Sequence, residues 1–135
     1  MEGTILEKVA TAWSSRFVGK RVLVVEDEFL LAEETRLKLE EMGATVVGPT
    51  ARVEHAISLI ARQAIDAAIL DIQLDGNDVF PVAESLKQRG IPFVFASAFG
   101  PFVIPERFRG YVLCDKPFEL ENIARGLFGP VCRDH

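Results

Sequence analysis

The chain has 135 residues, 49% of them hydrophobic, a length that fits one compact domain and leaves no room for a second. Fifteen Lys and Arg residues against twenty Asp and Glu residues give a net charge of −5, which argues against nucleic acid as a direct partner. No signal-peptide core precedes the first strand pattern, and no apolar run approaches the roughly 18 residues needed to cross a bilayer. We therefore expect a cytoplasmic protein that does not enter the membrane.

Patterns typical of strands and of helices alternate along the chain. Runs rich in β-branched residues indicate strands, and apolar residues at helical spacing indicate helices between them. In chain order, we expect a strand at 21–26, a helix at 29–42, a strand at 44–49, a helix at 53–63, a strand at 67–72, a helix at 79–90, strands at 91–96 and 111–115, and a helix at 120–128. Five strands with intervening helices predict an α/β fold with a doubly wound five-stranded parallel sheet.

The segment SAFGPFVIPERFRG, at 97–110, fits this alternation less well. It should hold a helix between the fourth and fifth strands, but it contains Gly100, Pro101, Pro105 and Gly110. At most about two helical turns could form there, so we expect a short and labile helix.

The residues before the first strand predict an extra N-terminal helix. Ile5, Val9, Trp13 and Phe17 recur every four residues and form one apolar stripe. Such a helix would either cover a face of its own domain or contact another protein. The chain would accordingly be a monomer, or a dimer formed through this helix.

Three acidic residues follow the ends of two predicted strands. Glu26 and Asp27 end the first strand, and Asp71 ends the third. The carboxyl ends of parallel strands form the site edge of such sheets, so these side chains should meet and repel one another. A hard divalent cation offsets that repulsion, and Mg²⁺ suits a site made of oxygen ligands. Alternatively, each acid merely caps the helix that follows it.

Ser97 ends the fourth strand and Lys116 follows the fifth, so both side chains should reach the same edge. A hydroxyl and an ammonium group beside a metal-bound carboxylate would form a receptor for a phosphoryl group, with Asp71 as the nucleophile. Taken singly, Lys116 could be a surface lysine and Ser97 a turn residue.

These residues resemble the receiver domain of two-component response regulators, and the resemblance covers 21–128. Asp71 follows Asp27 by 44 residues, a spacing typical of that family. The residues that stand in receiver order are Glu26, Asp27, Asp71, Ser97, Lys116 and Pro117. The resemblance implies a flavodoxin-like fold, with an N-terminal helical extension at 1–19, the receiver domain at 20–130 and a C-terminal tail at 131–135.

The resemblance also implies a chemistry. Asp71 would accept a phosphoryl group from a histidine kinase, and Ser97 and Lys116 would hold that group. Magnesium would be bound by Glu26, Asp27, Asp71 and the backbone carbonyl of Gln73. A cis peptide bond would precede Pro117. Such a domain is a signalling module that catalyses only its own phosphorylation and dephosphorylation.

Two departures from the usual receiver pattern stand out. Leu113 and Cys114 occupy the places where receivers carry an aromatic residue in the fifth strand. The stretch PFVFASAFG, at 92–100, is similar to the FATGUY signature of an atypical subgroup, with Phe99 in the aromatic place. That subgroup is associated with stand-alone receivers and HWE-type histidine kinases. We expect phosphorylation to reorder the 97–110 loop around Phe99, and Phe99 and Gln73 to modulate dephosphorylation.

Three other functions compete with this interpretation. A haloacid-dehalogenase-like phosphatase shares the Mg²⁺, Ser and Lys requirements, but its DxD motif would need an acid where Gln73 stands. A nucleotide- or flavin-binding module would need a Gly-rich loop directly after a strand, and no such loop follows any of the predicted strands. A degenerate receiver would act only as a scaffold. As a functional receiver without an attached output domain, the chain would signal by protein contact or by phosphate transfer in a phosphorelay.

Overall fold

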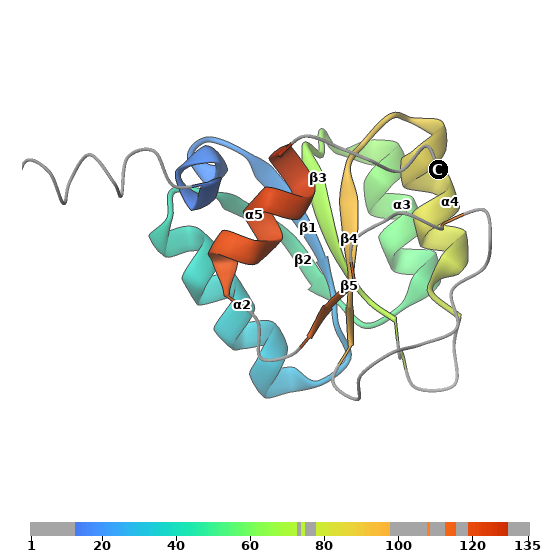
Figure 1. Ribbon diagram of the computed structural model, residues 1–135. Coiled ribbons are helices and arrows are strands. Elements are labelled where there is room, and N and C mark those ends of the chain that lie inside the picture. The colour runs from blue at the N-terminus through green and yellow to red at the C-terminus, as the bar shows by residue number, and fades with distance from the viewer. Residues whose placement is uncertain are drawn as a thin grey trace, which may run out of the picture.

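The computed structural model describes residues 13–72, 74, 78–97, 108, 113–115 and 119–129. The elements of these ranges alternate as the sequence predicts, and no predicted end differs from an observed one by more than two residues. They are η1 (Trp13–Phe17), β1 (Arg21–Val25), α2 (Phe29–Glu41), β2 (Thr45–Thr50), α3 (Val53–Arg62), β3 (Ala67–Asp71), α4 (Phe80–Gln88), β4 (Phe93–Ser97), β5 (Leu113–Asp115) and α5 (Leu120–Phe128) (Figure 1). The helix predicted within 97–110 lies outside the described residues, except for Phe108.

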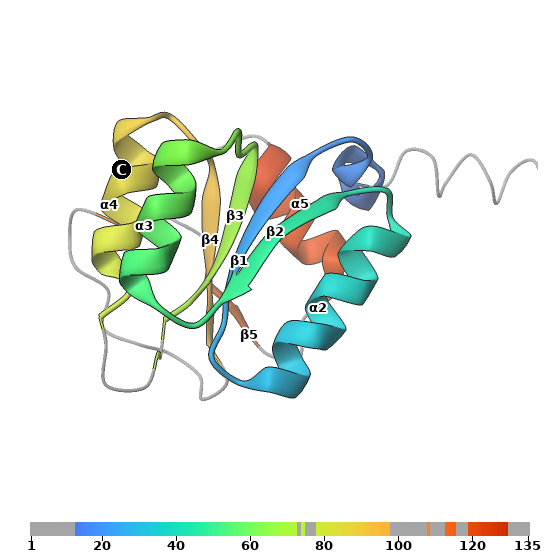
Figure 2. The ribbon, with the colours of Figure 1, turned by 180° about the vertical axis from the view of Figure 1, so that it is seen from behind.

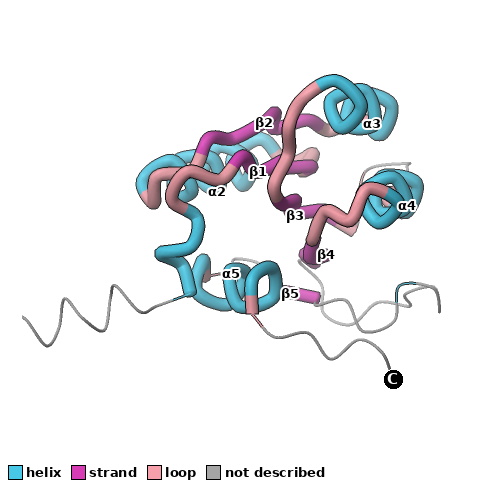
Figure 3. The backbone as a smooth tube through the Cα atoms, turned by 90° about the horizontal axis from the view of Figure 1, so that it is seen from above, coloured by secondary structure: helices cyan, strands magenta, loops and turns pink. Residues whose placement is uncertain are grey.

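The five strands form one parallel sheet in the order β2-β1-β3-β4-β5. Helices α3 and α4 cover one face of the sheet, and α2 and α5 cover the other (Figure 3). The view from behind shows the same division, with α3 and α4 together at one side and α2 across the sheet from them (Figure 2). The predicted flavodoxin-like, doubly wound α/β fold is confirmed.

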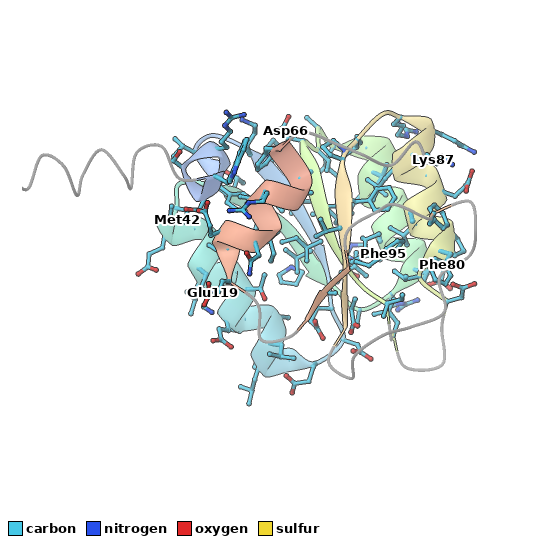
Figure 4. All side chains as sticks on the ribbon, in the orientation of Figure 1. Met42, Asp66, Phe80, Lys87, Phe95 and Glu119 are labelled. Atoms are coloured by element: carbon cyan, nitrogen blue, oxygen red, sulfur yellow. The ribbon has the colours of Figure 1, made fainter. Side chains whose placement is uncertain are left out.

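Burial on both faces explains why the central strands have almost no polar residues. All five residues of β3 are buried, because parallel strands covered on both sides read as continuous apolar runs. On the α3 and α4 side, Phe80 packs edge-on against Phe95 with ring centroids 5.6 Å apart (Figure 4). Phe108 stacks on Phe80 at 5.6 Å and is fully buried. A group of aromatic rings thus joins β4 and α4 within a core that is otherwise aliphatic.

The opposite face of the sheet includes part of the predicted N-terminal helix. Trp13–Phe17 form a short 3-10 helix, η1, that lies against α5. Phe17 is fully buried, and its ring meets that of Phe128 edge-on at 5.4 Å. Two residues of the predicted apolar stripe thus cover the chain's own domain, whereas Ile5 and Val9 lie outside the described residues.

A carboxylate holds η1 in place from the other end of the sequence. Glu121 of α5 accepts hydrogen bonds from the backbone N–H groups of Trp13, at 2.8 Å, and Ser14, at 3.0 Å. These donors, with the Ser14 amide first, hold the pKa of Glu121 below its ordinary value. The first N–H groups of a helix have no acceptor within the helix, so the Glu121 carboxylate provides the acceptors that η1 itself lacks.

Candidate metal centre

The strand-end acids meet as the sequence predicts. Strands β1 and β3 are neighbours, with Val25 opposite Leu70, so the following residues, Glu26 and Asp71, lie at the same edge of the sheet. One carboxylate oxygen from each of Glu26, Asp27 and Asp71 lies within 4.8 Å of the other two. We call this group the acid cluster. It joins the carboxyl ends of the two central strands, where ligand sites of such sheets form.

The members of the acid cluster differ in exposure. Asp71 is 3% exposed and Glu26 is 7% exposed, whereas Asp27 is more open to solvent. Buried carboxylates are uncommon, because ionised groups lose hydration when they enter a protein interior. The acid cluster thus consists of two buried acids and one that is accessible to solvent.

Backbone hydrogen bonds hold both strand ends in register. The Glu26 N–H donates to the carbonyl of Thr50 at 2.9 Å, and the Ile72 N–H donates to the carbonyl of Ala96 at 2.9 Å. The first bond continues the hydrogen bonding between β1 and β2 to Glu26, and the second continues that between β3 and β4 to Ile72, the residue after Asp71. Asp71 therefore belongs to the sheet, and the Glu26 backbone, one residue past β1, is hydrogen-bonded to it.

The tip of β2 has a local irregularity that the sequence analysis did not anticipate. The register between β1 and β2 shifts between Leu23 and Val25, next to a cis peptide bond between Gly48 and Pro49. Gly48 has a φ of 91°, and a Cβ there would lie 3.0 Å from the Thr50 nitrogen. Glycine is therefore required at this position. The cis bond predicted before Pro117 lies outside the described residues.

Helix capping does not account for the acid cluster. The N-cap of α2 is Glu28, whose carboxylate accepts the Leu31 N–H at 2.8 Å. The N-cap of α4 is Val79, and the preceding Asp78 accepts the Phe80 N–H at 2.9 Å. Glu26, Asp27 and Asp71 are thus not the capping residues of the helices that follow them.

Sequence reasoning missed Glu28 as a component of this region. Its backbone N–H donates to Oε2 of Glu26 at 3.0 Å, so it contacts the acid cluster directly. The signal was present in the sequence, because Glu28 immediately precedes the first apolar residues of the helical pattern. It was missed because Ser, Thr, Asp and Asn are the usual N-caps, and Glu is not.

The remaining predicted site residues can be placed only in part. Ser97 is the last residue of β4 and pairs with Asp115, the last residue of β5, so the backbone of Ser97 lies at the same edge of the sheet as the acid cluster. The other predicted site residues lie outside the described residues, and they are Gln73, Phe99, Lys116 and Pro117.

The donor set of the acid cluster fits a hard divalent cation. All three groups offer oxygen, the ligand atom that Mg²⁺ and Ca²⁺ prefer. Around a bound Mg²⁺, neighbouring oxygens lie about 3.0 Å apart and opposite ones about 4.2 Å apart, so the three carboxylates would draw closer together on binding. Glu26, Asp27 and Asp71 would hold the ion, which would reduce the repulsion among them and attract an anionic group.

The fold and this cluster together define a flavodoxin-like α/β domain with a group of acidic residues at its strand ends. Residues 22–124 match the family model of the response regulator receiver domain. The chain belongs to the receiver domain family of two-component response regulators, which are signalling domains. None of the helices in the described ranges combines the length and apolar character that crossing a bilayer requires.

Curated relatives include sensory transduction and transcriptional regulatory proteins. The chain is 33% identical over 114 residues to the sensory transduction protein LytT of Bacillus anthracis, an alignment that covers 79% of this chain and 45% of the relative. It is 29% identical over 112 residues to the transcriptional regulatory protein PdtaR of Mycobacterium tuberculosis, covering 78% of this chain and 54% of the relative. The chain thus spans about half the length of these relatives.

Solved structures of similar fold include SdrG and PhyR. SdrG from Sphingomonas melonis Fr1 superimposes with a TM-score of 0.72 at 38% identity, covering 82% of this chain and 95% of that one. PhyR from Brucella abortus, a response regulator, gives a TM-score of 0.69 at 28% identity, covering 94% of this chain and 53% of that one. The match therefore covers nearly the whole of the SdrG chain and about half of the PhyR chain.

Proposed function

We propose that this chain is a phosphoacceptor in a two-component system, in which Asp71 takes a phosphoryl group from the phosphohistidine of a histidine kinase. The observation that carries the proposal is the convergence of three carboxylates within 4.8 Å at the ends of β1 and β3. Membership of the receiver family and the likeness to SdrG support it.

The proposed chemistry is a transfer between two nucleophiles. A carboxylate oxygen of Asp71 attacks phosphorus, a P–O bond forms, and the P–N bond to the kinase histidine breaks with its electrons returning to the imidazole. The product is an acyl phosphate on Asp71. Bound Mg²⁺ would supply positive charge to the transferring group.

The chain's own residues take the other roles in this proposal. Glu26, Asp27 and the backbone carbonyl of Gln73 join Asp71 in holding Mg²⁺. Ser97 donates a hydrogen bond to the phosphoryl group, and Lys116 neutralises part of its charge. A cis bond before Pro117 would turn Lys116 inward.

We also assign the chain to the FATGUY subgroup, on the PFVFASAFG stretch at 92–100. In that setting Phe99 reorders the loop that follows β4, and Phe99 and Gln73 tune the lifetime of the acyl phosphate. The donor is then an HWE-type histidine kinase acting in the cytoplasm. The signal leaves through contact with a downstream protein or by phosphorelay, from a receiver domain at 20–130 that is preceded by an extension at 1–19 and followed by a tail at 131–135.

A phosphotransfer assay tests the proposal. A phosphorylated histidine kinase is mixed with wild type, Asp71→Asn and Asp78→Asn, each with Mg²⁺ and with EDTA. We expect label on wild type and on Asp78→Asn in Mg²⁺, and none on Asp71→Asn or in EDTA. Labelling that persists in Asp71→Asn would refute Asp71 as the acceptor. Turnover of a small phosphate ester by wild type would favour the phosphatase alternative instead.

A further inference from the structure

Glu28 connects the acid cluster to helix α2 through two hydrogen bonds. Its backbone N–H donates to Oε2 of Glu26 at 3.0 Å, and its carboxylate accepts the Leu31 N–H at 2.8 Å. We propose that Glu28 is a positioning residue of the metal centre, which sets the orientation of the Glu26 carboxylate by capping α2. This inference rests on the proposed function, because it assumes that the acid cluster binds Mg²⁺.

The backbone of Glu26 leaves the direction of its side chain open. Its N–H is bonded to the carbonyl of Thr50 at 2.9 Å, which ties the Glu26 backbone to β2. The direction of the carboxylate then depends on the side-chain torsions, and a donor approaching from one side selects among them. The Glu28 N–H is such a donor, and it occupies one of the two oxygens of Glu26.

The direction of the Glu28 N–H depends in turn on the conformation of the N-cap residue. Glu28 has φ −90° and ψ 114°, the extended conformation of an N-cap, while Phe29 already belongs to α2. The bond from Leu31 to the Glu28 carboxylate closes the first turn and holds this conformation. Without the cap, the first turn frays, and the N–H that holds Glu26 moves with it.

The contact with Glu26 is strong enough to matter for binding. An N–H donor facing an ionised carboxylate forms a charge-assisted bond, which is stronger than a bond between neutral groups. Glu26 is 7% exposed, so water competes weakly for that bond. Metal sites respond to such outer contacts, because residues that orient a ligand change the affinity of the ion as well as the shape of the site.

Two other roles for Glu28 make different predictions. If Glu28 acted through its negative charge, any neutral residue there would weaken Mg²⁺ binding equally. If it served only the stability of α2, substituting it would lower the melting temperature and leave the affinity for Mg²⁺ unchanged.

Three variants separate these roles. Glu28→Ala removes both the cap and the charge, whereas Glu28→Ser removes the charge and keeps a preferred capping group. Glu41→Ala, at the exposed far end of α2, matches the charge change of Glu28→Ala away from the cluster.

The test measures the dissociation constant of Mg²⁺ alone by calorimetry, at a temperature where circular dichroism shows every variant folded. We expect Glu28→Ala to weaken binding about five-fold, the factor that corresponds to loss of an N-cap. Glu28→Ser should bind within about two-fold of wild type, and Glu41→Ala should bind like wild type. In amide exchange, the N–H groups of Glu28 and Leu31 should lose protection in Glu28→Ala and regain it in Glu28→Ser.

The other possible outcomes would refute either this inference or the proposed function on which it rests. Equal weakening in the Ala and Ser variants would replace the capping role with a charge effect and end the inference. Unchanged affinity in Glu28→Ala, whatever its melting temperature, would end it as well. A wild type that binds no Mg²⁺ would refute the proposed function, on which the inference depends. If Glu28→Ala does not fold, Glu28→Leu, another neutral residue that caps helices poorly, replaces it in the comparison with Glu28→Ser.

Discussion

Carboxylates serve different purposes in two regions of this domain. At the contact between η1 and α5, Glu121 faces the amides of Trp13 and Ser14. At the ends of β1 and β3, three carboxylates face one another within 4.8 Å. A carboxylate that accepts N–H groups from a distant segment joins two parts of a chain, whereas carboxylates gathered close together favour a cation. The first region is a structural contact and the second is the candidate metal centre.

The largest effect is expected on the structural side of this comparison. Phe17→Ala removes a fully buried ring that packs against Phe128, and should lower the free energy of unfolding by about 3 kcal/mol. Val18→Ala, one residue along at 64% exposure, is the matched control and should change stability little. Urea denaturation of both variants checks this. Equal losses would mean that η1 is not packed against α5 in solution.

The next largest effect is expected from Mg²⁺, which should raise the stability of the folded chain only when the acid cluster is intact. An ion that binds only the folded state raises its stability by roughly 2.7 kcal/mol when its free concentration is about 100 times the dissociation constant. We expect Mg²⁺ to raise the melting temperature of wild type and of Glu121→Gln, and not that of Asp27→Asn. A shift retained in Asp27→Asn would show that the ion binds outside the acid cluster.

Without Mg²⁺, neutralising a single acid should have opposite signs in the two regions. Asp71→Asn relieves repulsion within the acid cluster and should raise the free energy of unfolding by about 1 kcal/mol. Glu121→Gln weakens two charge-assisted bonds and should lower it. Thermal melts in EDTA at low ionic strength measure both changes. Changes of the same sign in both variants would contradict the comparison.

The smallest expected effect is a pH dependence at Glu121. The pKa of Glu121 is lower in the folded chain than its ordinary value of 4.5, because the amides of Ser14 and Trp13 stabilise the ionised form. Its contribution to stability is complete above that ordinary value, and is lost as the pH falls through the lowered pKa. The difference in stability between wild type and Glu121→Gln should therefore shrink below pH 4.5. A difference that stayed constant would mean that Glu121 is not ionised in its contact with η1.

Much of the architecture follows from local patterns in the sequence. The order of strands and helices, with ends accurate to two residues, comes from spacing that reflects which side of each element is buried. The placing of Glu26, Asp27 and Asp71 at one edge follows from the same reasoning, because parallel strands end together. The roles of Ser97 and Lys116, argued from their places at strand ends, and that of Phe99, which came from the resemblance, stay predictions.

Only the tertiary structure shows how distant segments meet. The Glu121 carboxylate accepts a hydrogen bond from an amide 108 residues away in sequence. The carbonyl of Thr50, which follows the cis Gly48–Pro49 bond, accepts a hydrogen bond from the Glu26 N–H. The double role of Glu28, as the cap of α2 and as the donor to Glu26, is likewise visible only in the tertiary structure. A residue pattern reports the burial of each element along its own length. It carries no record of which atoms of distant elements come within hydrogen-bond distance, because the packing of the whole chain determines those contacts.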